Sequence, residues 1–274
     1  MGPAEAVVVL ILVVTAGVSI AAFYQPQIQE RLIFCPERIL AHKEYYRLVS
    51  SALLHADWWH LLINSYVFWA FGLPIATNYG PHQLALIYLG SILGGSLLAL
   101  LIHRHHDYRA LGASGGTCGV IFACLFLFPG TGVAHLFLIP LPGWLFLILF
   151  LLGSYYGIRT QRDNIGHDAH LGGAIVGLLI TTALYPQIVR ASPKLYTAVL
   201  VISLLIFGAL LYNPLHLPWK TYARPSRGPG ARPEESPAEA ERLDAILEKI
   251  SKSGLHSLSR AEHEFLRRAS RPKK

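Results

Sequence analysis

Residues 110–158 read ALGASGGTCGVIFACLFLFPGTGVAHLFLIPLPGWLFLILFLLGSYYGI and contain no Lys, Arg, Asp or Glu. A soluble core does not need so long a stretch without charge, whereas the hydrocarbon interior of a bilayer does. The whole chain follows the same trend, because 53% of its 274 residues are hydrophobic and only 14% are charged, against roughly 25% in an ordinary soluble protein. This composition excludes a disordered chain, a coiled coil and a disulfide-stapled module, and it indicates a polytopic membrane protein.

Further apolar segments lie on both sides of this stretch. About 20 helical residues, rising about 1.5 Å each, cross a hydrocarbon core of roughly 30 Å. We therefore expect an all-α membrane protein with a six-helix transmembrane core, a seventh C-terminal span and a short helical tail. The segment 114–129 is short for a span, which suggests a helix that begins below the membrane surface. The expected spans are 6–24, 58–78, 83–102, 114–129, 134–157, 169–185 and 196–212.

The end of the chain differs in composition from the rest. Residues 220–274 contain 13 of the 23 Lys/Arg and 8 of the 16 Asp/Glu, so most of the net charge of +7 belongs to them. A basic segment beside a membrane more often meets anionic lipid headgroups, so we expect the lipid bilayer as a partner and no nucleic acid. The three cysteines are scattered along the chain, which favours free thiols.

The composition also predicts how the chain is divided. Ser236-Pro-Ala-Glu239 and Ser259-Arg-Ala-Glu262 are capping boxes, each of which is typical of a helix N-terminus. The tail is therefore expected to hold two short amphipathic helices, joined to the membrane part by a flexible Pro/Gly-rich linker. The expected parts are a six-span core (1–190), a seventh span (191–218), the linker (219–235) and the polar tail (236–274).

Four polar residues lie near the starts of the second, fourth and sixth spans: His60, Asn64, Ser114 and His170. Successive spans run in opposite directions, so these starts share one side of the membrane. Polar groups at depth are expensive unless they are satisfied or functional. The four side chains are therefore candidates for one site.

The residue types suggest acyl-transfer chemistry. Gly173 and Gly177 follow His170 at a spacing that lets a neighbouring backbone approach closely, which can bring the imidazole to Ser114 and activate its hydroxyl. His60 and Asn64 are four residues apart, share a helix face and can donate hydrogen bonds to a developing oxyanion. Taken singly, a packing serine, an interfacial histidine and a structural His–Asn bond remain open alternatives.

Two other motif interpretations are excluded. Gly112-Ala-Ser114-Gly-Gly116 formally matches the nucleophile elbow of soluble α/β hydrolases, but it lies among membrane spans and no acid precedes Asp163 between Ser114 and His170. A membrane metalloprotease needs H-E-x-x-H, which is absent. We expect no metal and no cofactor.

At this point the motifs resemble those of the rhomboid family of intramembrane serine proteases, over roughly residues 1–190. Each motif alone is weak, but their order and spacing on the expected spans make the combination specific. The matching segments are Tyr46-Arg47, His55-Ala-Asp-Trp-Trp-His60-Leu-Leu-Ile-Asn64, Gly112-Ala-Ser114-Gly115 and Gly166-His-Asp-Ala-His170-Leu-Gly-Gly173.

The resemblance implies a rhomboid-like core with a water-filled cavity that opens to the extracytoplasmic side. It implies Ser114 as nucleophile and His170 as general base, without an acidic third member, and His60, Asn64 and the Ser114 backbone N–H as the oxyanion hole. Arg47 and the first loop would brace the fold, and the fifth span would act as a gate. One departure is Cys118, where many members carry an aromatic residue.

The resemblance further implies single-pass transmembrane proteins as substrates and, as location, a bacterial inner membrane. The alternative is a catalytically silent relative that binds and escorts membrane proteins. A transporter would predict internal repeats, which the sequence lacks. With a cytoplasmic N-terminus and seven spans, the basic tail lies outside, against the positive-inside rule, so the side of the tail stays open. The oligomeric state is also open.

Overall fold

The computed structural model describes residues 1–130, 141–161 and 163–212, together with six positions of the tail: Ile246, Lys249, Ser259, Ala261, Glu262 and Phe265. Regular secondary structure in these residues is helical throughout, and the only extended pairing among them is an isolated bridge between Phe34 and Ala110. The chain divides into two compact units, Met1–Pro218 and Trp219–Lys274.

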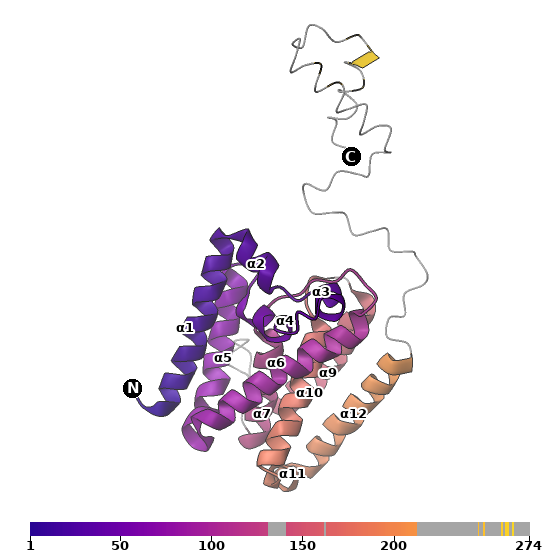
Figure 1. Cartoon of the computed structure of the whole chain (residues 1–274). Coiled ribbons are helices and arrows are strands. Elements are labelled where there is room, and N and C mark those ends of the chain that lie inside the picture. Colours follow the sequence, from indigo (N-terminus) through magenta and orange to yellow (C-terminus); the bar gives the residue numbers. More distant parts are fainter. Residues whose placement is uncertain are drawn as a thin grey trace. The chain divides into compact units, whose positions relative to one another are not determined.

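The first unit is a bundle of long helices (Figure 1). Most of their bounds agree with the predicted spans to within about one helical turn, because long apolar runs favour continuous helix in a membrane, even where they contain glycine or, as at Pro74 of α5, proline. The long helices are α1 (Pro3–Tyr24), α5 (Trp58–Tyr79), α6 (Pro81–His103), α7 (Ser114–Leu127), α9 (Gly143–Thr160), α10 (His167–Leu184) and α12 (Pro193–Tyr212).

The fifth predicted span, 134–157, is the exception. Its helix, α9, begins at Gly143, and Pro142 precedes it with an extended backbone (φ −57°, ψ 138°). A residue that precedes proline avoids the helical region, so Leu141 does not extend the helix toward the N-terminus. Residues 134–140 lie outside the described part of the chain.

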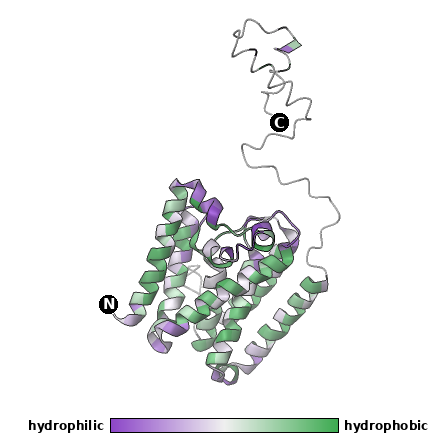
Figure 2. Ribbon diagram, in the orientation of Figure 1, coloured by the Kyte–Doolittle hydropathy of each residue, from purple (hydrophilic) through white to green (hydrophobic). Residues whose placement is uncertain are grey.

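Length and composition identify membrane spans among these helices. Helices α1, α6, α9 and α12 are long and apolar enough to cross a bilayer, and α7 is a shorter apolar helix. The hydropathy colouring shows apolar residues along the long helices and hydrophilic ones gathered at α2 (Pro26–Leu32) and at helix ends (Figure 2). The chain is therefore an all-α membrane protein with a core of six long helices, α1, α5, α6, α7, α9 and α10, followed by α12.

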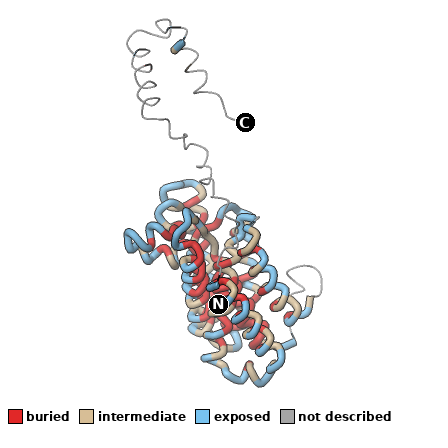
Figure 3. The backbone as a smooth tube through the Cα atoms, turned by 90° about the vertical axis from the view of Figure 1, so that its right-hand side faces the viewer, coloured by how far each residue is buried: buried red, intermediate tan, exposed pale blue. Residues whose placement is uncertain are grey.

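Helix α7 forms the interior of the bundle. Every one of its residues from Gly115 to Leu127 is buried, and Figure 3 shows buried backbone inside the bundle with exposed backbone around it. A helix of 14 residues is only about 21 Å long at 1.5 Å per residue. Its first residue, Ser114, is half-buried, and the fully buried part of the helix follows it.

Glycines allow α6, α7 and α10 to touch backbone to backbone. A Cβ at Gly173 would collide with the Gly115 backbone, and one at Gly177 would lie 2.5 Å from Gly119 Cα. On α6, a Cβ at Gly95 would collide with the Ala169 carbonyl. The close approach that the Gly173–Gly177 spacing predicted is confirmed.

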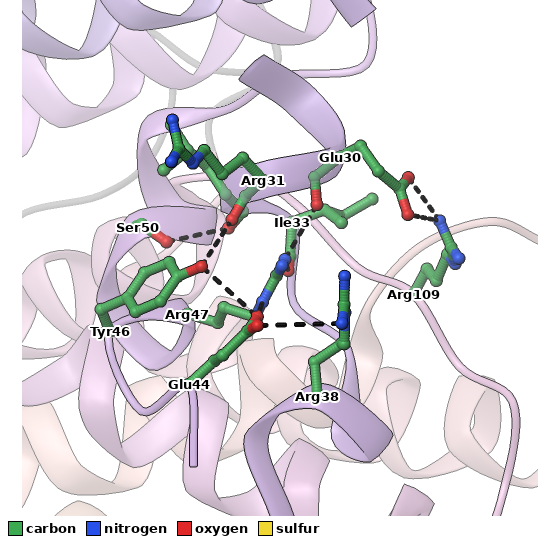
Figure 4. A network of polar contacts seen from close by, with 10 residues as sticks. Glu30, Arg31, Ile33, Arg38, Glu44, Tyr46, Arg47, Ser50 and Arg109 are labelled. Atoms are coloured by element: carbon green, nitrogen blue, oxygen red, sulfur yellow. Dashed lines mark hydrogen bonds and ion pairs between the residues drawn. The ribbon is translucent and has the colours of Figure 1, made fainter. Parts of the chain in front are cut away.

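The loop between α1 and α5 is folded. It contains α2, α3 (Pro36–Ala41), α4 (Arg47–Ser50) and the 3₁₀ turn η1 (Ser51–Leu53). Arg47, which is 3% exposed, donates through Nη1 to the carbonyls of Glu30 (3.0 Å) and Ile33 (2.7 Å) and pairs with Glu44 (Figure 4). One buried guanidinium thus satisfies backbone carbonyls that no helix satisfies, which stabilises the loop.

Part of the tail prediction can be compared with the second unit. Ser259 N donates to Glu262 Oε2 (2.6 Å) and Glu262 N donates to Ser259 Oγ (3.3 Å), so the second capping box is confirmed. The linker 219–235 and the first box, Ser236–Glu239, lie outside the described residues.

Candidate active site

Ser114 occupies the first position of α7. The turn before it depends on Gly112, whose φ of +130° is strained for any residue with a Cβ. Gly112 N donates to Ser51 O (3.0 Å), which ties this turn to the folded first loop. The local structure therefore places the Ser114 hydroxyl at the start of a buried helix, where the polypeptide changes direction.

His170 of α10 meets Ser114 across the glycine contact of α7 and α10. The distance from His170 Nε2 to Ser114 Oγ is 2.7 Å. For the hydroxyl to donate to Nε2, the neutral imidazole must carry its proton on Nδ1. The structure thus brings together two of the predicted site residues that are 56 positions apart, in the geometry of a serine paired with a base.

His60 lies on the other side of the same point. Asp57 caps α5 by accepting from His60 N (2.8 Å), which fixes His60 in the first helical turn. A Cβ built on Gly112 would lie 3.2 Å from His60 Nε2 and 3.5 Å from Ser114 Oγ. The imidazole and the hydroxyl therefore converge on the same small volume, which a side chain at position 112 would fill.

Asn64 lies one turn further along α5. Its Nδ2 donates to the His60 backbone carbonyl (3.1 Å). The structural alternative was a hydrogen bond between the two side chains, and the structure shows this bond to the backbone instead. Asn64 and Ala113, the residue before Ser114, line a small cavity. An amide nitrogen has two hydrogens, so Asn64 can donate a second hydrogen bond in addition to the one to His60.

An aromatic ring from α9 lies near the His170 imidazole. The sequence has Cys118 at the position where many family members carry an aromatic residue. The Phe150 ring centroid is 6.5 Å from that of His170, at 28° between the planes. That separation is within the range over which aromatic rings interact. Cys118 itself is buried one turn after Ser114. The ring that faces the imidazole thus comes from another helix.

Sequence reasoning gave no role to a second polar cluster near the site. Asp168, in the first turn of α10, is 3% exposed, and its carboxylate meets His103 of α6 and Tyr108 of the loop before α7. The sequence did offer one indication of this cluster, because Asp168 is a charged residue at the start of a span and charges are rare in the spans. Its partners are 60 or more positions away, so spacing could not reveal them.

His55 is a further buried histidine that the sequence reasoning named only as part of a motif. Its Nδ1 lies 3.0 Å from Ser19 Oγ, its ring packs edge-on against His60 with centroids 4.8 Å apart, and Nε2 has no hydrogen-bond partner among the described residues. Burial lowers the pKa of His55, which lies before α5, to about 4. The neutral ring is therefore the form that suits this environment.

The fold and the site together define a class: a helical membrane bundle that carries a half-buried Ser–His pair. A comparison of the sequence with models of protein families agrees with this class: the model of the Rhomboid domain matches residues 42–187. The chain belongs to the rhomboid family. A second model, a family of unknown function (DUF6576), matches residues 234–272.

Curated relatives carry rhomboid names. The chain is 29% identical over 173 residues to Rhomboid protein 1, mitochondrial, of Saccharomyces cerevisiae, covering 60% of this chain and 50% of that protein. It is 35% identical over 152 residues to RHOMBOID-like protein 12, mitochondrial, of Arabidopsis thaliana (48% and 44% covered), and 28% identical over 183 residues to Rhomboid protease GluP of Bacillus subtilis (66% and 34%). The chain thus spans half or less of the length of these three relatives.

These relatives bear on the expected location. They include mitochondrial proteins as well as a bacterial one, so the comparisons do not favour the bacterial inner membrane that the resemblance implied. The coarser statement, an integral membrane protein, rests on the apolar helices and the family.

Proposed function

We propose that this chain is an intramembrane serine endopeptidase that cleaves transmembrane segments of single-pass membrane proteins. The observation that carries the proposal is the 2.7 Å contact between Ser114 Oγ and His170 Nε2, made between two helices of an integral membrane protein. Membership of the rhomboid family, with a relative named as a protease, supports the same activity.

The proposed reaction follows from the positions of these groups. His170 Nε2 accepts the Ser114 proton while Oγ attacks a peptide carbonyl, and the tetrahedral oxyanion accepts hydrogen bonds from His60, Asn64 and the Ser114 backbone N–H. The His170 imidazolium then donates its proton to the leaving amine, and an acyl-enzyme forms. Water then attacks the ester carbonyl while His170 accepts its proton, and the imidazolium returns that proton to Ser114 Oγ as the bond to the acyl carbon breaks and the acid product leaves.

The substrate class is argued from the backbone chemistry of membrane helices. A transmembrane helix hides its carbonyls in internal hydrogen bonds, so the cleaved segment must unwind before Ser114 can attack. Segments with small residues, Gly or Pro have weak helix propensity. We therefore expect substrates whose spans contain such a segment near one end, at the depth of Ser114.

The decisive experiment compares Ser114→Ala with the wild type on a model transmembrane substrate in proteoliposomes. Ser203→Ala is the matched control, because Ser203 is a serine within another helix, α12. We expect Ser114→Ala to abolish cleavage, with the melting temperature unchanged, and Ser203→Ala to cleave normally. Substantial cleavage by Ser114→Ala contradicts the proposal. Binding of the substrate without cleavage by the wild type indicates the alternative, a silent scaffold.

A further inference from the structure

The ends of three chain segments meet next to the Ser114–His170 pair. Helix α6 ends at His103, the loop 104–113 leads from it to Ser114, and α10 begins at His167. Each segment contributes one side chain to a polar cluster, formed by His103, Tyr108 and Asp168, which we call the α10 anchor. None of the three touches Ser114 or His170 in the contacts described above, so the proposed reaction leaves the cluster without a role.

The contacts within the α10 anchor are close, with His103 and Asp168 buried and Tyr108 half-buried. Tyr108 Oη donates to Asp168 Oδ1 (3.2 Å), and His103 Nε2 lies 2.9 Å from Asp168 Oδ2. The rings of His103 and Tyr108 are stacked, with centroids 3.7 Å apart and 3° between their planes. Apart from this contact, Asp168 Oδ2 has no hydrogen-bond partner among the described residues, and the His103 imidazole is the polar group that lies beside it.

The electrostatics of the cluster keep Tyr108 as a donor. Burial and the neighbouring Asp168 carboxylate raise the pKa of Tyr108, so the phenol stays protonated and can donate. Tyr108 is held in turn by the first loop, because its ring meets Phe34 edge-on (6.1 Å) and Phe34 pairs with Ala110 through two backbone hydrogen bonds. The anchor is therefore attached to the folded loop as well as to α6.

Asp168 connects this cluster to the turn that carries His170. Its Oδ1 also accepts from Ala169 N (2.9 Å), at the orphaned N-terminus of α10, where a carboxylate is favourable. The Ala169 carbonyl fits against Gly95 of α6 and Gly115 of α7, where a Cβ would be too close. The first turn of α10 is thus fixed on one side by glycine contacts and on the other by the carboxylate.

We propose that Asp168, together with Tyr108 and His103, is a positioning group that holds the first turn of α10 so that His170 stays within hydrogen-bond distance of Ser114. This inference rests on the proposed function for its kinetic consequence, although the geometry that it concerns can be measured without cleavage. A displacement of about 1 Å at a reacting group can cost about 100-fold in rate. Release of the anchor should therefore lower kcat and leave KM unchanged, because no substrate contact is removed.

The test uses Tyr108→Phe and Asp168→Asn in the full chain, reconstituted in liposomes. Tyr108→Phe removes one hydroxyl and keeps the stacked ring, so it is the variant least expected to disturb folding. Tyr185→Phe is the matched control, because Tyr185 Oη donates to Tyr79 O (3.4 Å) just beyond the opposite end of α10. Three quantities are measured: kcat and KM on a transmembrane substrate, the melting temperature, and the ¹⁵N chemical shift of the His170 imidazole.

We expect kcat to fall about 10- to 100-fold in both anchor variants, with KM unchanged, and the His170 shift to move toward its value in Ser114→Ala. Tyr185→Phe should leave all three quantities as in the wild type. A His170 shift that stays at the wild-type value in both anchor variants overturns the inference, as does a loss of kcat that only follows the loss of folded protein. If the wild type does not cleave, the proposed function fails, and the His170 shift alone decides whether the anchor positions the imidazole.

Discussion

Asn64 and Asn78 make the same local contact on α5 but lie in different surroundings. Each side chain donates to the carbonyl four residues earlier, Asn64 to His60 (3.1 Å) and Asn78 to Pro74 (2.9 Å). Only Asn64 also borders the cavity next to Ala113. A comparison of substitutions at Asn64 and Asn78 therefore distinguishes a role in the site from the ordinary effect of an asparagine that bonds to its own helix.

We expect Asn64→Ala to reduce kcat by about 10²–10³-fold, as the loss of one oxyanion donor does in serine hydrolases. Asn78→Ala removes the equivalent hydrogen bond, to the Pro74 carbonyl, and should leave kcat unchanged. The measurement is cleavage of a transmembrane substrate in proteoliposomes. Equal effects of the two substitutions would show that Asn64 acts only through its helix.

A second residue-scale prediction concerns pH. The folded pKa of His55, about 4, is below the usual 6.5, so the unfolded chain takes up a proton that the folded chain does not. Stability from this group is fully present above pH 6.5 and is lost as the pH falls toward 4, by at most about 3 kcal/mol. The melting temperature of the wild type should therefore fall over this range more steeply than that of His55→Gln.

The control for this experiment is His82→Gln, which replaces an exposed histidine at the start of α6. It should reproduce the wild-type pH dependence in the same detergent. If His55→Gln and the wild type lose stability in parallel between pH 7 and pH 4.5, the buried imidazole is not the group that responds.

At the scale of elements, the contact between α7 and α10 decides whether the site exists. Backbone meets backbone there, since a Cβ at Gly173 would collide with Gly115 and one at Gly177 with Gly119, and the Ser91 side chain of α6 packs beside Gly119 and Gly177. The seam therefore sets the distance between the helices that carry Ser114 and His170. Neither side chain has the freedom to recover that distance if the helices separate.

Gly173→Ala should accordingly abolish cleavage and lower stability by about 1–3 kcal/mol, the usual cost of overpacking, because the added Cβ collides with Gly115. Gly208→Ala on α12 is the matched control. A Cβ at Gly208 meets nothing within 4 Å, and alanine is the better helix former by about 1 kcal/mol. Thermal unfolding and cleavage are measured for both, and wild-type cleavage by Gly173→Ala would contradict the proposed role of the seam.

At the scale of the whole molecule, the chain combines two units with different compositions. The described candidate site residues all lie in the first unit, Met1–Pro218, which also contains the match to the Rhomboid domain. The second unit carries the match to the family of unknown function and most of the net positive charge.

A chain that ends at Pro218 should therefore retain folding and cleavage at the wild-type rate. Its melting temperature and its cleavage of the model substrate are compared with those of the full chain, and Ser114→Ala in the shorter chain provides the background. A large loss of cleavage, with the melting temperature unchanged, would mean that residues 219–274 contribute to the activity.

The local parts of this structure were predictable. The helices of the core follow from apolar length, Pro142 explains the one large shift of a boundary, and the capping box at Ser259 follows from two residues three positions apart. The short helices of the first loop were not located, because their order depends on Arg47 reaching the carbonyls of Glu30 and Ile33. Such contacts are not encoded in a periodic pattern.

The sequence by itself determined the membrane class, the helices and the four candidate residues, since hydropathy and spacing act within one helix. Only the tertiary structure decided that Phe150 faces His170, that buried His55 finds no Nε2 partner among the described residues, and that Asp168 meets Tyr108 and His103. These pairs join segments far apart in the chain. Asp168 reaches its partners because glycines let α6, α7 and α10 approach to backbone distance, a packing result that appears only once the helices are assembled.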